Sequence, residues 1–342
     1  MDGSEAVMAR IAELVPGGGR ALDIAPCAVS GNNRVFRVTA ADGASYIAKS
    51  YYHHPSDTRD RLHAEWSFLS YAAGLGIACV PRPLSRAAES HLALYEFVAG
   101  EKVPPGAVTA ADVAAAADFL GALNPADRAA RAAALPVASE GCFSIADHLA
   151  SVDGRIARLG RLAEESAVHA AAIRFADVLA ADWTRRRAEM LARAAAAGHD
   201  AAVPIATADR GLSPSDFGFH NALRRADGTL AFIDFEYAGW DDPAKTLGDF
   251  FSQPAVPVDR AHRGRFLDAL LGIVSDARAL EFRAALLEPA FALKWCCIML
   301  NEFLPEAAAR RRFADPASDT AARQAAQLAK AERAFELIQR LW

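Results

Sequence analysis

Short apolar runs separated by turn residues fill the chain up to about Val98. Val35–Val38 and Tyr46–Lys49 alternate side chains between two faces, which predicts two strands. Asp42-Gly43 lies between them and predicts a hairpin turn, because glycine accepts the positive φ that such turns need. His91–Phe97 predicts a further strand of the same small sheet.

A helix is expected between the second and third of these strands. Ser56 and Asp57 follow Pro55 and are helix-start residues. Apolar side chains then recur at helical spacing, at Leu62, Trp66, Leu69 and Ala73. The first part of the chain is therefore predicted to be a small sheet with one helix packed on it.

After Gly100 the pattern becomes alanine-rich with helical periodicity. Three helices are expected, at Ala110–Leu123, Ile145–Leu162 and Ala170–Ala197. Leu212–Trp240 interrupts them with a loop, two β-like runs and a second loop, and helical periodicity resumes at about Arg260. This order predicts an α+β fold of two lobes, a small β-rich lobe over 1–98 and a larger α-helical lobe over 99–342 with an embedded hairpin.

Composition narrows the classes of partner. The 342 residues are 53% hydrophobic with a net charge of −5, which argues against nucleic acid as the main partner. No run of about 18 uncharged apolar residues and no signal-like N-terminal segment occurs, so we expect a cytoplasmic protein without a membrane span. The five cysteines lack metal-ligand spacing and are expected to be reduced thiols. The oligomeric state stays open.

The embedded hairpin carries oxygen ligands at its open end. Asp227-Gly228 predicts a two-residue turn, and with that turn Asn221 lies directly opposite Asp234. Cross-strand Cβ atoms are about 5 Å apart, so the amide and the carboxylate would lie side by side. Such a pair of oxygen donors suits Mg²⁺.

Asp216 lies five residues before Asn221 in the same loop. Phosphoryl transfer needs metal ions on the phosphates and a carboxylate that orients the attacking hydroxyl and accepts its proton. Asp216 fits the carboxylate role, and Asn221 and Asp234 fit the metal-binding role.

The joint spacing of these residues resembles a known family. Asp216-x-x-x-x-Asn221, followed by Ile233-Asp234-Phe235-Glu236 and Gly239-Trp240-x-Asp-Pro243, is similar to the catalytic and metal-binding segments of aminoglycoside phosphotransferases. Choline kinases and fructosamine kinases share this arrangement. The resemblance implies a bilobal protein-kinase-like fold, ATP or GTP as phosphate donor, Mg²⁺, and a small-molecule hydroxyl as acceptor.

The motif departs from the family pattern before its catalytic aspartate. Members usually carry His-Gly there, and this chain has Pro214-Ser215. A catalytically impaired nucleotide-binding module is therefore an alternative, although the other motif residues are all present. Asp249 lies three residues later than the aspartate usually found after the Asp-Pro pair, and we assign it no role.

The nucleotide would be held by the first lobe. Lys49 shares a strand face with Ile47 and needs an anion if that face is buried. Glu65 can supply it, because it borders the apolar stripe of the predicted helix, about 60° from Leu62. The resemblance implies that Lys49 contacts the α and β phosphates and that Glu65 orients it.

Two further nucleotide-binding segments are implied by order along the chain. Ser30, Gly31 and Asn32 match the position of the phosphate-covering loop, although a plain turn explains them equally well. Glu96 and Val98 fall in the segment that would bond adenine through its backbone.

The acceptor is not identified by the sequence. Glu288, Trp295 and Glu302 recur at seven-residue spacing, and an acidic and aromatic face would suit a cationic acceptor. A half-buried helix with solvated carboxylates is the alternative that we favour. A protein substrate is disfavoured, because the segment between Asp234 and Asp242-Pro243 is too short for a peptide platform. A sugar, amino sugar or amino alcohol is the acceptor class that we expect.

Overall fold

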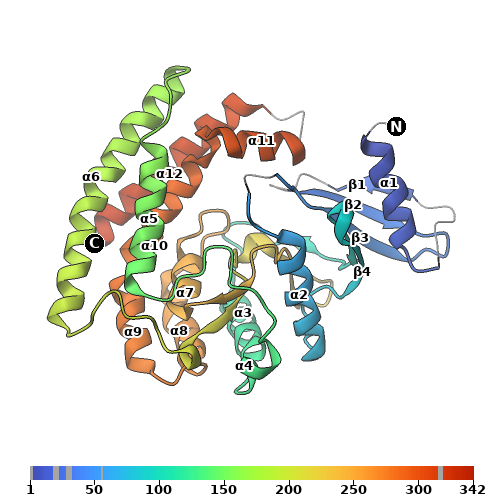
Figure 1. Cartoon of the computed structure of the whole chain (residues 1–342), viewed down its shortest axis with the longest axis horizontal. Helices are drawn as coiled ribbons and strands as arrows, with labels where there is room; N and C mark the ends of the chain where they lie inside the picture. The colour runs from blue at the N-terminus through green and yellow to red at the C-terminus, as the bar shows by residue number, and fades with distance from the viewer. Residues whose placement is uncertain (1–2, 18–22, 28–32, 55–56, 315–318) are drawn as a thin grey trace.

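An antiparallel sheet forms the N-terminal lobe of the computed structural model, which describes residues 3–17, 23–27, 33–54, 57–314 and 319–342 (Figure 1). Its strands are β1 (Asp23–Pro26), β2 (Arg34–Thr39), β3 (Ser45–Ser50), β4 (Pro83–Ala87) and β5 (Leu92–Glu96), in the spatial order β1-β2-β3-β5-β4. The predicted hairpin joins β2 to β3, with Gly43 at a φ of +85° in its turn. The strands predicted before and after this turn, and the one predicted at His91–Phe97, are all present.

Two helices cover this sheet, where the sequence predicted one. Helix α1 (Gly3–Leu14) was missed; its Ile11 is fully buried in a cluster that contains Leu92 and Leu94 of β5. Helix α2 (Arg61–Gly74) packs with the intervening residues of β5, Ala93 and Tyr95, and so covers the other face.

Helix α2 begins later than predicted. Its N-cap is Asp60, whose carboxylate accepts a hydrogen bond from the His63 backbone N–H at 2.9 Å. Asp57 binds Arg59 and Arg61 instead, each at 2.7 Å, so its carboxylate is already used by side chains. Ser56 lies outside the described residues.

Helices dominate the C-terminal lobe. They are α3 (Ala110–Leu123), α4 (Arg128–Arg131), α5 (Ile145–Leu159), α6 (Ala167–Ala196), α7 (Pro243–Ser252), α8 (Arg263–Leu271), α9 (Ala277–Leu286), α10 (Glu288–Met299), α11 (Pro305–Ala314) and α12 (Thr320–Leu341). The three helices predicted after Gly100 are present as α3, α5 and α6. Helical structure resumes at Pro243 rather than near Arg260, because Asp242 caps α7 through its Ala244 N–H and Pro243 occupies the first turn.

Two small sheets interrupt the helices and position the loops between them. β6 (Glu101–Lys102) pairs with β8 (Ala222–Arg224), which pairs with β9 (Leu230–Phe232). β7 (Gly211–Ser213) pairs with β10 (Gly239–Asp241). The two pairings fix both ends of the loop 214–221 and of the segment 233–238.

One hydrophobic core runs through both lobes. Phe68 of α2 stacks on Phe235 at a centroid distance of 4.8 Å, and Phe119 of α3 stacks on Phe232 at 4.9 Å. A second core joins α5, α6, α10 and α12. The division of the chain at residue 98 stays a prediction, because the first of these cores crosses it.

Helix α11 reaches from the C-terminal lobe toward the N-terminal sheet (Figure 1). The Arg34 Nε donates to the Phe313 carbonyl oxygen at 3.0 Å, and the Arg34 guanidinium lies 4.6 Å from the centroid of the Phe313 ring. Tyr52 meets the same ring edge-on at 5.4 Å. The lobes are thus joined on this side as well as through the core.

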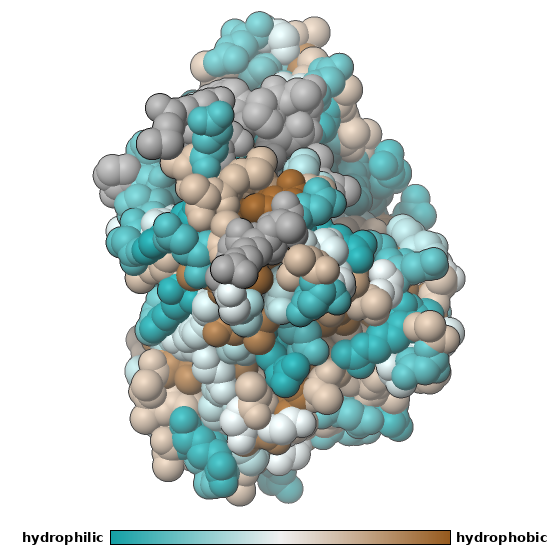
Figure 2. Space-filling view, turned by 90° about the vertical axis from the view of Figure 1, so that its right-hand side faces the viewer, coloured by the Kyte–Doolittle hydropathy of each residue, from teal (hydrophilic) through white to brown (hydrophobic). Residues whose placement is uncertain are grey.

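The face on the side of the N-terminal lobe mixes hydrophilic and weakly hydrophobic residues, and its strongly hydrophobic areas are small and separate (Figure 2). In the described part of the chain, no single helix has the length and apolar composition to cross a membrane. Ala277–Leu286 and Glu288–Phe303 meet those criteria only as a pair, bent by 50°.

Candidate functional site

A buried lysine joins two carboxylates where the lobes meet. Lys49 Nζ donates to both oxygens of Glu65, at 2.7 and 2.9 Å, and to Asp234 Oδ1 at 2.8 Å. Lys49 is 9% exposed and Glu65 is 1% exposed. The structure therefore brings together three residues that the sequence assigned to the phosphate and metal sites.

Glu65 is held in place by further hydrogen bonds. The Tyr51 hydroxyl donates to Glu65 Oε2 at 2.7 Å and lies 2.7 Å from the Tyr95 hydroxyl. The Phe235 N–H donates to Glu65 Oε1 at 3.3 Å. Tyr51 and Tyr95 were not predicted, since an alternating strand pattern does not distinguish a tyrosine that supports a carboxylate from one that only fills space.

Charge balance decides the protonation states in this cluster. Burial alone would lower the pKa of Lys49, but the carboxylates of Asp234 and Glu65 outweigh it and raise that pKa. Burial would raise the pKa of Asp234, but the Lys49 ammonium outweighs it and lowers that pKa. Lys49 and Asp234 are thus both charged near neutral pH. Asp234 has a φ of +71°, an uncommon conformation for a residue with a side chain.

The register predicted for the embedded hairpin is wrong by one residue. Ala222 pairs with Phe232 and Arg224 with Leu230, and the Arg225 N–H donates to the Thr229 carbonyl oxygen at 2.8 Å. The turn therefore contains 226–228, with a φ of +83° at Gly228, rather than two residues.

Asn221 consequently lies opposite Ile233, whose N–H donates to the Asn221 carbonyl oxygen at 2.9 Å. Asp234 is the next residue, so both remain at the open end of the hairpin.

The loop that carries Asp216 is fixed by short-range bonds. Asn221 Nδ2 donates to the Asp216 carbonyl oxygen at 3.0 Å. The Ser215 N–H donates to Ser213 Oγ at 3.0 Å, and Thr246 Oγ1 lies 2.9 Å from the same oxygen. Ser215 has a φ of +67°, so a residue with a side chain occupies the position where the family usually has glycine.

His220 contacts the candidate catalytic carboxylate, a contact that the sequence did not predict. Its Nε2 lies 3.1 Å from Asp216 Oδ1. In the sequence, the only sign of this contact was the position of His220 directly before Asn221.

The residues at the hairpin opening fit a magnesium ion. The Asn221 side-chain N–H₂ donates to the Asp216 carbonyl oxygen, which leaves the amide oxygen as a metal ligand. Asp234 contributes a carboxylate. No group of three or more histidine, cysteine, aspartate or glutamate side chains suited to a metal ion occurs among the described residues. Mg²⁺ commonly takes one or two protein ligands and completes its shell with phosphates and water, so two oxygen donors suffice.

Glu236 is another acidic residue in this region; the sequence analysis quoted it within a motif and gave it no role. It is 3% exposed and contacts Asn33 and, at 3.7 Å, the Arg61 Nε. Burial and the nearby Asp234 carboxylate raise its pKa to about 7. Asn33 directly follows Ser30, Gly31 and Asn32, which lie outside the described residues.

The segment predicted to bond adenine follows β5. Glu96 ends that strand, and its N–H donates to the Arg82 carbonyl oxygen at 2.9 Å. The backbone of Val98 makes no hydrogen bond within the part of the chain that the structure describes. A cavity of about 380 Å³ is lined by this segment and by Arg225 and Asp227 at the hairpin.

Glu288 and Glu302, which the sequence offered as an acidic face for a cationic acceptor, are both paired with arginines. Glu288 binds Arg260 at 2.6 Å and Arg263 at 3.0 Å. Glu302 lies beyond the end of α10 and binds Arg311 at 2.8 Å and Arg323 at 3.3 Å. The same helix contributes Lys294 and Trp295 to Asp249, at 2.7 and 3.0 Å. These contacts satisfy the carboxylates within the protein and give Asp249 a structural role.

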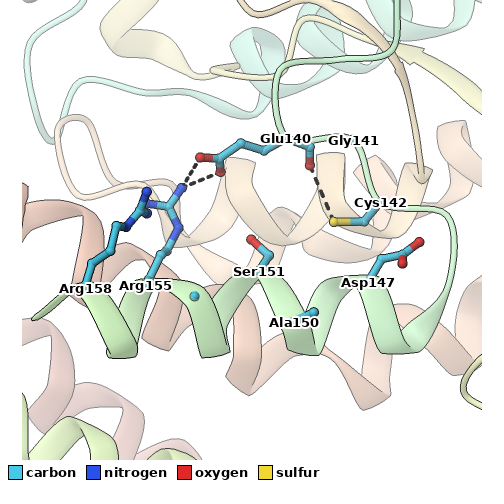
Figure 3. Close-up of a pocket in the computed structure, with 9 residues that line it drawn as sticks. Glu140, Gly141, Cys142, Asp147, Ala150, Ser151, Arg155 and Arg158 are labelled. Carbon is cyan, nitrogen blue, oxygen red and sulfur yellow. Dashed lines mark hydrogen bonds and ion pairs between the residues drawn. The ribbon is translucent and has the colours of Figure 1, made fainter. Parts of the chain in front are cut away.

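A separate cavity of about 410 Å³ lies between α5 and the loop at Glu140–Cys142 (Figure 3). Arg155 and Arg158 lie at one end of it, and Cys142 and Asp147 at the other. None of the residues discussed as catalytic or metal-binding lines this cavity.

Comparison with known proteins identifies the family of the chain. The family model that matches, over residues 23–286, is described as the phosphotransferase enzyme family. A search of curated proteins gave no match.

Solved structures resemble the whole chain. An ethanolamine kinase from Plasmodium vivax is 12% identical, with a TM-score of 0.57 over 96% of this chain and 87% of its own. A spectinomycin phosphotransferase solved with ADP and spectinomycin is 12% identical, with a TM-score of 0.59 over 96% and 98%. An amicoumacin kinase solved with AMP-PNP and Ca²⁺ is 16% identical, with a TM-score of 0.53 over 100% and 94%. These likenesses confirm the predicted bilobal, kinase-like α+β fold.

Proposed function

The chain belongs to the phosphotransferase enzyme family, as its motifs predicted, and from that premise we propose that it transfers the γ-phosphoryl group of ATP to a hydroxyl of a small molecule. The observation that carries the proposal is the buried cluster of Lys49, Glu65 and Asp234, which lies beside the loop of Asp216 and Asn221. A lysine held between two carboxylates from distant parts of the chain is costly to bury, and a site for triphosphate and metal accounts for that cost.

The nucleotide phosphates would be bound by Lys49. Glu65 keeps the lysine ammonium pointed at the junction of the lobes, and the Tyr51 hydroxyl fixes Glu65 in turn. Glu96 and Val98 would offer backbone groups to the base, and Ser30, Gly31 and Asn32 would cover the phosphates. Similarity to enzymes solved with ADP and AMP-PNP supports an adenine nucleotide, and GTP is the second donor to test.

Asn221 and Asp234 would hold Mg²⁺. When bound, this ion neutralises negative charge on the phosphate oxygens as the bond to the leaving group breaks. Asp234 can serve both Lys49 and a metal because a carboxylate has two oxygens and only Oδ1 binds the lysine.

Asp216 would orient the acceptor hydroxyl and take its proton. Its side chain is 36% exposed, so the carboxylate can be reached by a small acceptor. As the hydroxyl oxygen bonds to phosphorus, the bond to the β-phosphate oxygen breaks and the proton passes to Asp216. We propose a sugar, amino sugar or amino alcohol as the acceptor, in keeping with the small-molecule kinases that share the fold.

A catalytically impaired nucleotide-binding module is the second candidate function. The observation in its favour is the positive φ of Ser215, which places a side chain in a conformation suited to glycine next to Asp216. Against it stands the full set of Lys49, Glu65, Asp216, Asn221 and Asp234.

Thermal unfolding with ATP, in the presence and absence of Mg²⁺, tests the nucleotide site. A ligand at about 100 times its Kd adds about 2.7 kcal/mol to stability, so a Mg²⁺-dependent rise in Tm is expected for the wild type. Asp234→Ala should lose that rise. No rise with ATP or GTP would reject the proposal.

Turnover then separates the two candidate functions. ADP release is measured with choline, ethanolamine, aminoglycosides and sugars, in wild type and Asp216→Asn. Acceptor-dependent release that is absent from Asp216→Asn supports the kinase, whereas nucleotide binding without turnover supports the impaired module.

A further inference from the structure

The side chain of His220 lies against the carboxylate proposed to take the acceptor proton. Its Nε2 is 3.1 Å from Asp216 Oδ1, and the two residues are four positions apart in one loop. We infer that His220 is a positioning residue that fixes the orientation of the Asp216 carboxylate. The inference rests on the proposed function, since it gives His220 a role in the same reaction.

The surroundings of His220 are built to hold its ring in one place. The preceding residue, Phe219, is fully buried and packs on Phe250 at 5.5 Å, which anchors the 3₁₀ helix η3 (Phe219–Asn221) in the core. Lys102 Nζ donates to the His220 carbonyl oxygen at 2.8 Å. A Cβ atom at Gly218 would lie only 2.8 Å from His220 Nδ1, so the ring occupies space that glycine leaves open.

The other ring nitrogen shows which tautomer fits. His220 Nδ1 is buried and has no hydrogen-bond partner among the described residues. A buried N–H without an acceptor is costly, so Nδ1 is better left as a bare lone pair and the hydrogen placed on Nε2. In that tautomer, Nε2–H donates to Asp216 Oδ1.

This hydrogen bond leaves one carboxylate oxygen for chemistry. Within the described residues, Asp216 Oδ2 has no hydrogen-bond partner, and the side chain is partly exposed. The acceptor proton therefore goes to Oδ2, while His220 keeps its own hydrogen throughout the reaction. A carboxylate held by one oxygen cannot rotate freely, and this preorganisation favours the reactive geometry.

The inference also accounts for the altered motif. Pro214-Ser215 replaces the residues that usually shape the loop before the aspartate, and Ser215 adopts a φ of +67°. His220 restrains Asp216 from the other end of the loop, so the carboxylate does not depend on the missing histidine.

Three variants test the inference by steady-state ATP turnover with Mg²⁺, measured with an acceptor found in the panel above or, failing that, with water. His220→Ala should lower kcat by about 10- to 100-fold and leave the KM for ATP within about twofold, because a misplaced base affects the transition state and not nucleotide binding. His220→Gln keeps an N–H donor at a similar reach and should recover much of the loss. Gly218→Ala keeps the imidazole but displaces it, and should lower kcat as well. His63→Ala, on the exposed side of α2, is the matched control.

The outcomes separate the inference from the proposed function. An active wild type with His220→Ala within about twofold of it overturns the inference and leaves the function standing. Recovery in His220→Gln supports positioning, whereas a Gln variant as impaired as Ala overturns it, because the imidazole would then be needed for itself. A wild type with no turnover overturns both. If His220→Ala does not fold, Gly218→Ala decides, and full activity there rejects the inference.

Discussion

Neutralising Glu65 tests whether the charges of Lys49, Glu65 and Asp234, at the proposed nucleotide site, depend on one another. In Glu65→Gln the side chain keeps its size but loses the charge that lies 2.7 Å from Lys49 Nζ. At an effective dielectric constant of about 20, two unit charges at this distance attract by about 6 kcal/mol. Removing one partner of a buried pair costs about 3–5 kcal/mol after relaxation.

The remaining partner reduces that cost. Asp234 still binds Lys49 at 2.8 Å, so the lysine is not left unpaired. The Tyr51 hydroxyl donates to Oε2 and the Phe235 N–H to Oε1, so the single amide oxygen of glutamine keeps an acceptor for one of these two donors. We therefore expect Glu65→Gln to lower the free energy of unfolding by about 2–3 kcal/mol. With Lys49 drawn toward Asp234, we also expect ATP to bind about tenfold more weakly in the presence of Mg²⁺.

Urea unfolding and calorimetric titration with ATP measure both effects. Glu89→Gln is the control, because Glu89 binds Arg10 on the surface with its side chain 64% exposed. Such surface pairs contribute at most about 1 kcal/mol. If Glu65→Gln changes stability and ATP affinity no more than Glu89→Gln does, the reasoning about the cluster is wrong.

Three other predictions follow from the structure. Ser215→Gly should raise the free energy of unfolding by about 0.5–1 kcal/mol, because relief of the positive φ outweighs the extra freedom of glycine in the unfolded chain. Ser215→Ala should give no gain, and a glycine variant that is less stable than the wild type in urea unfolding would show that Ser215 is not strained. Gly239→Ala should cost more than about 2 kcal/mol, since the new Cβ would lie 2.4 Å from the Pro136 carbonyl oxygen, whereas Gly264→Ala in α8 meets open space and should be neutral or stabilising in the same measurement. Burial would lower the pKa of His148, but its bond to Asp242 outweighs this and raises the pKa to about 9. The contribution of protonated His148 to stability is complete below the unfolded pKa of about 6.5 and is lost as pH rises through about 9. The free energy of unfolding of His148→Gln, measured in urea, should therefore lack this decline with rising pH.

Local patterns in the sequence determined much of the architecture. Alternating residues predicted β2, β3 and β5, and helical spacing predicted α3, α5 and α6, because each pattern depends on neighbours within a few positions. Helix α1 was missed although Val7, Ile11 and Leu14 recur at helical spacing and Ile11 is buried against the sheet. The family was readable as well, since Asp216, Asn221 and Asp234 lie close together in the chain.

Contacts between distant segments were decided only by the tertiary structure. The bond from Lys49 to Asp234 joins residues 185 positions apart, and no local period encodes it. The predicted pairing of Asn221 with Asp234 failed by one residue, because the turn at Gly228 holds three residues rather than two, and the length of a turn shifts every pair beyond it. Spacing along the chain made Asp216 a candidate, but it gave no sign of the His220 ring that contacts its carboxylate. The approach of His220 depends on the space left by Gly218 and on the buried anchor of Phe219, and both are properties of packing in three dimensions.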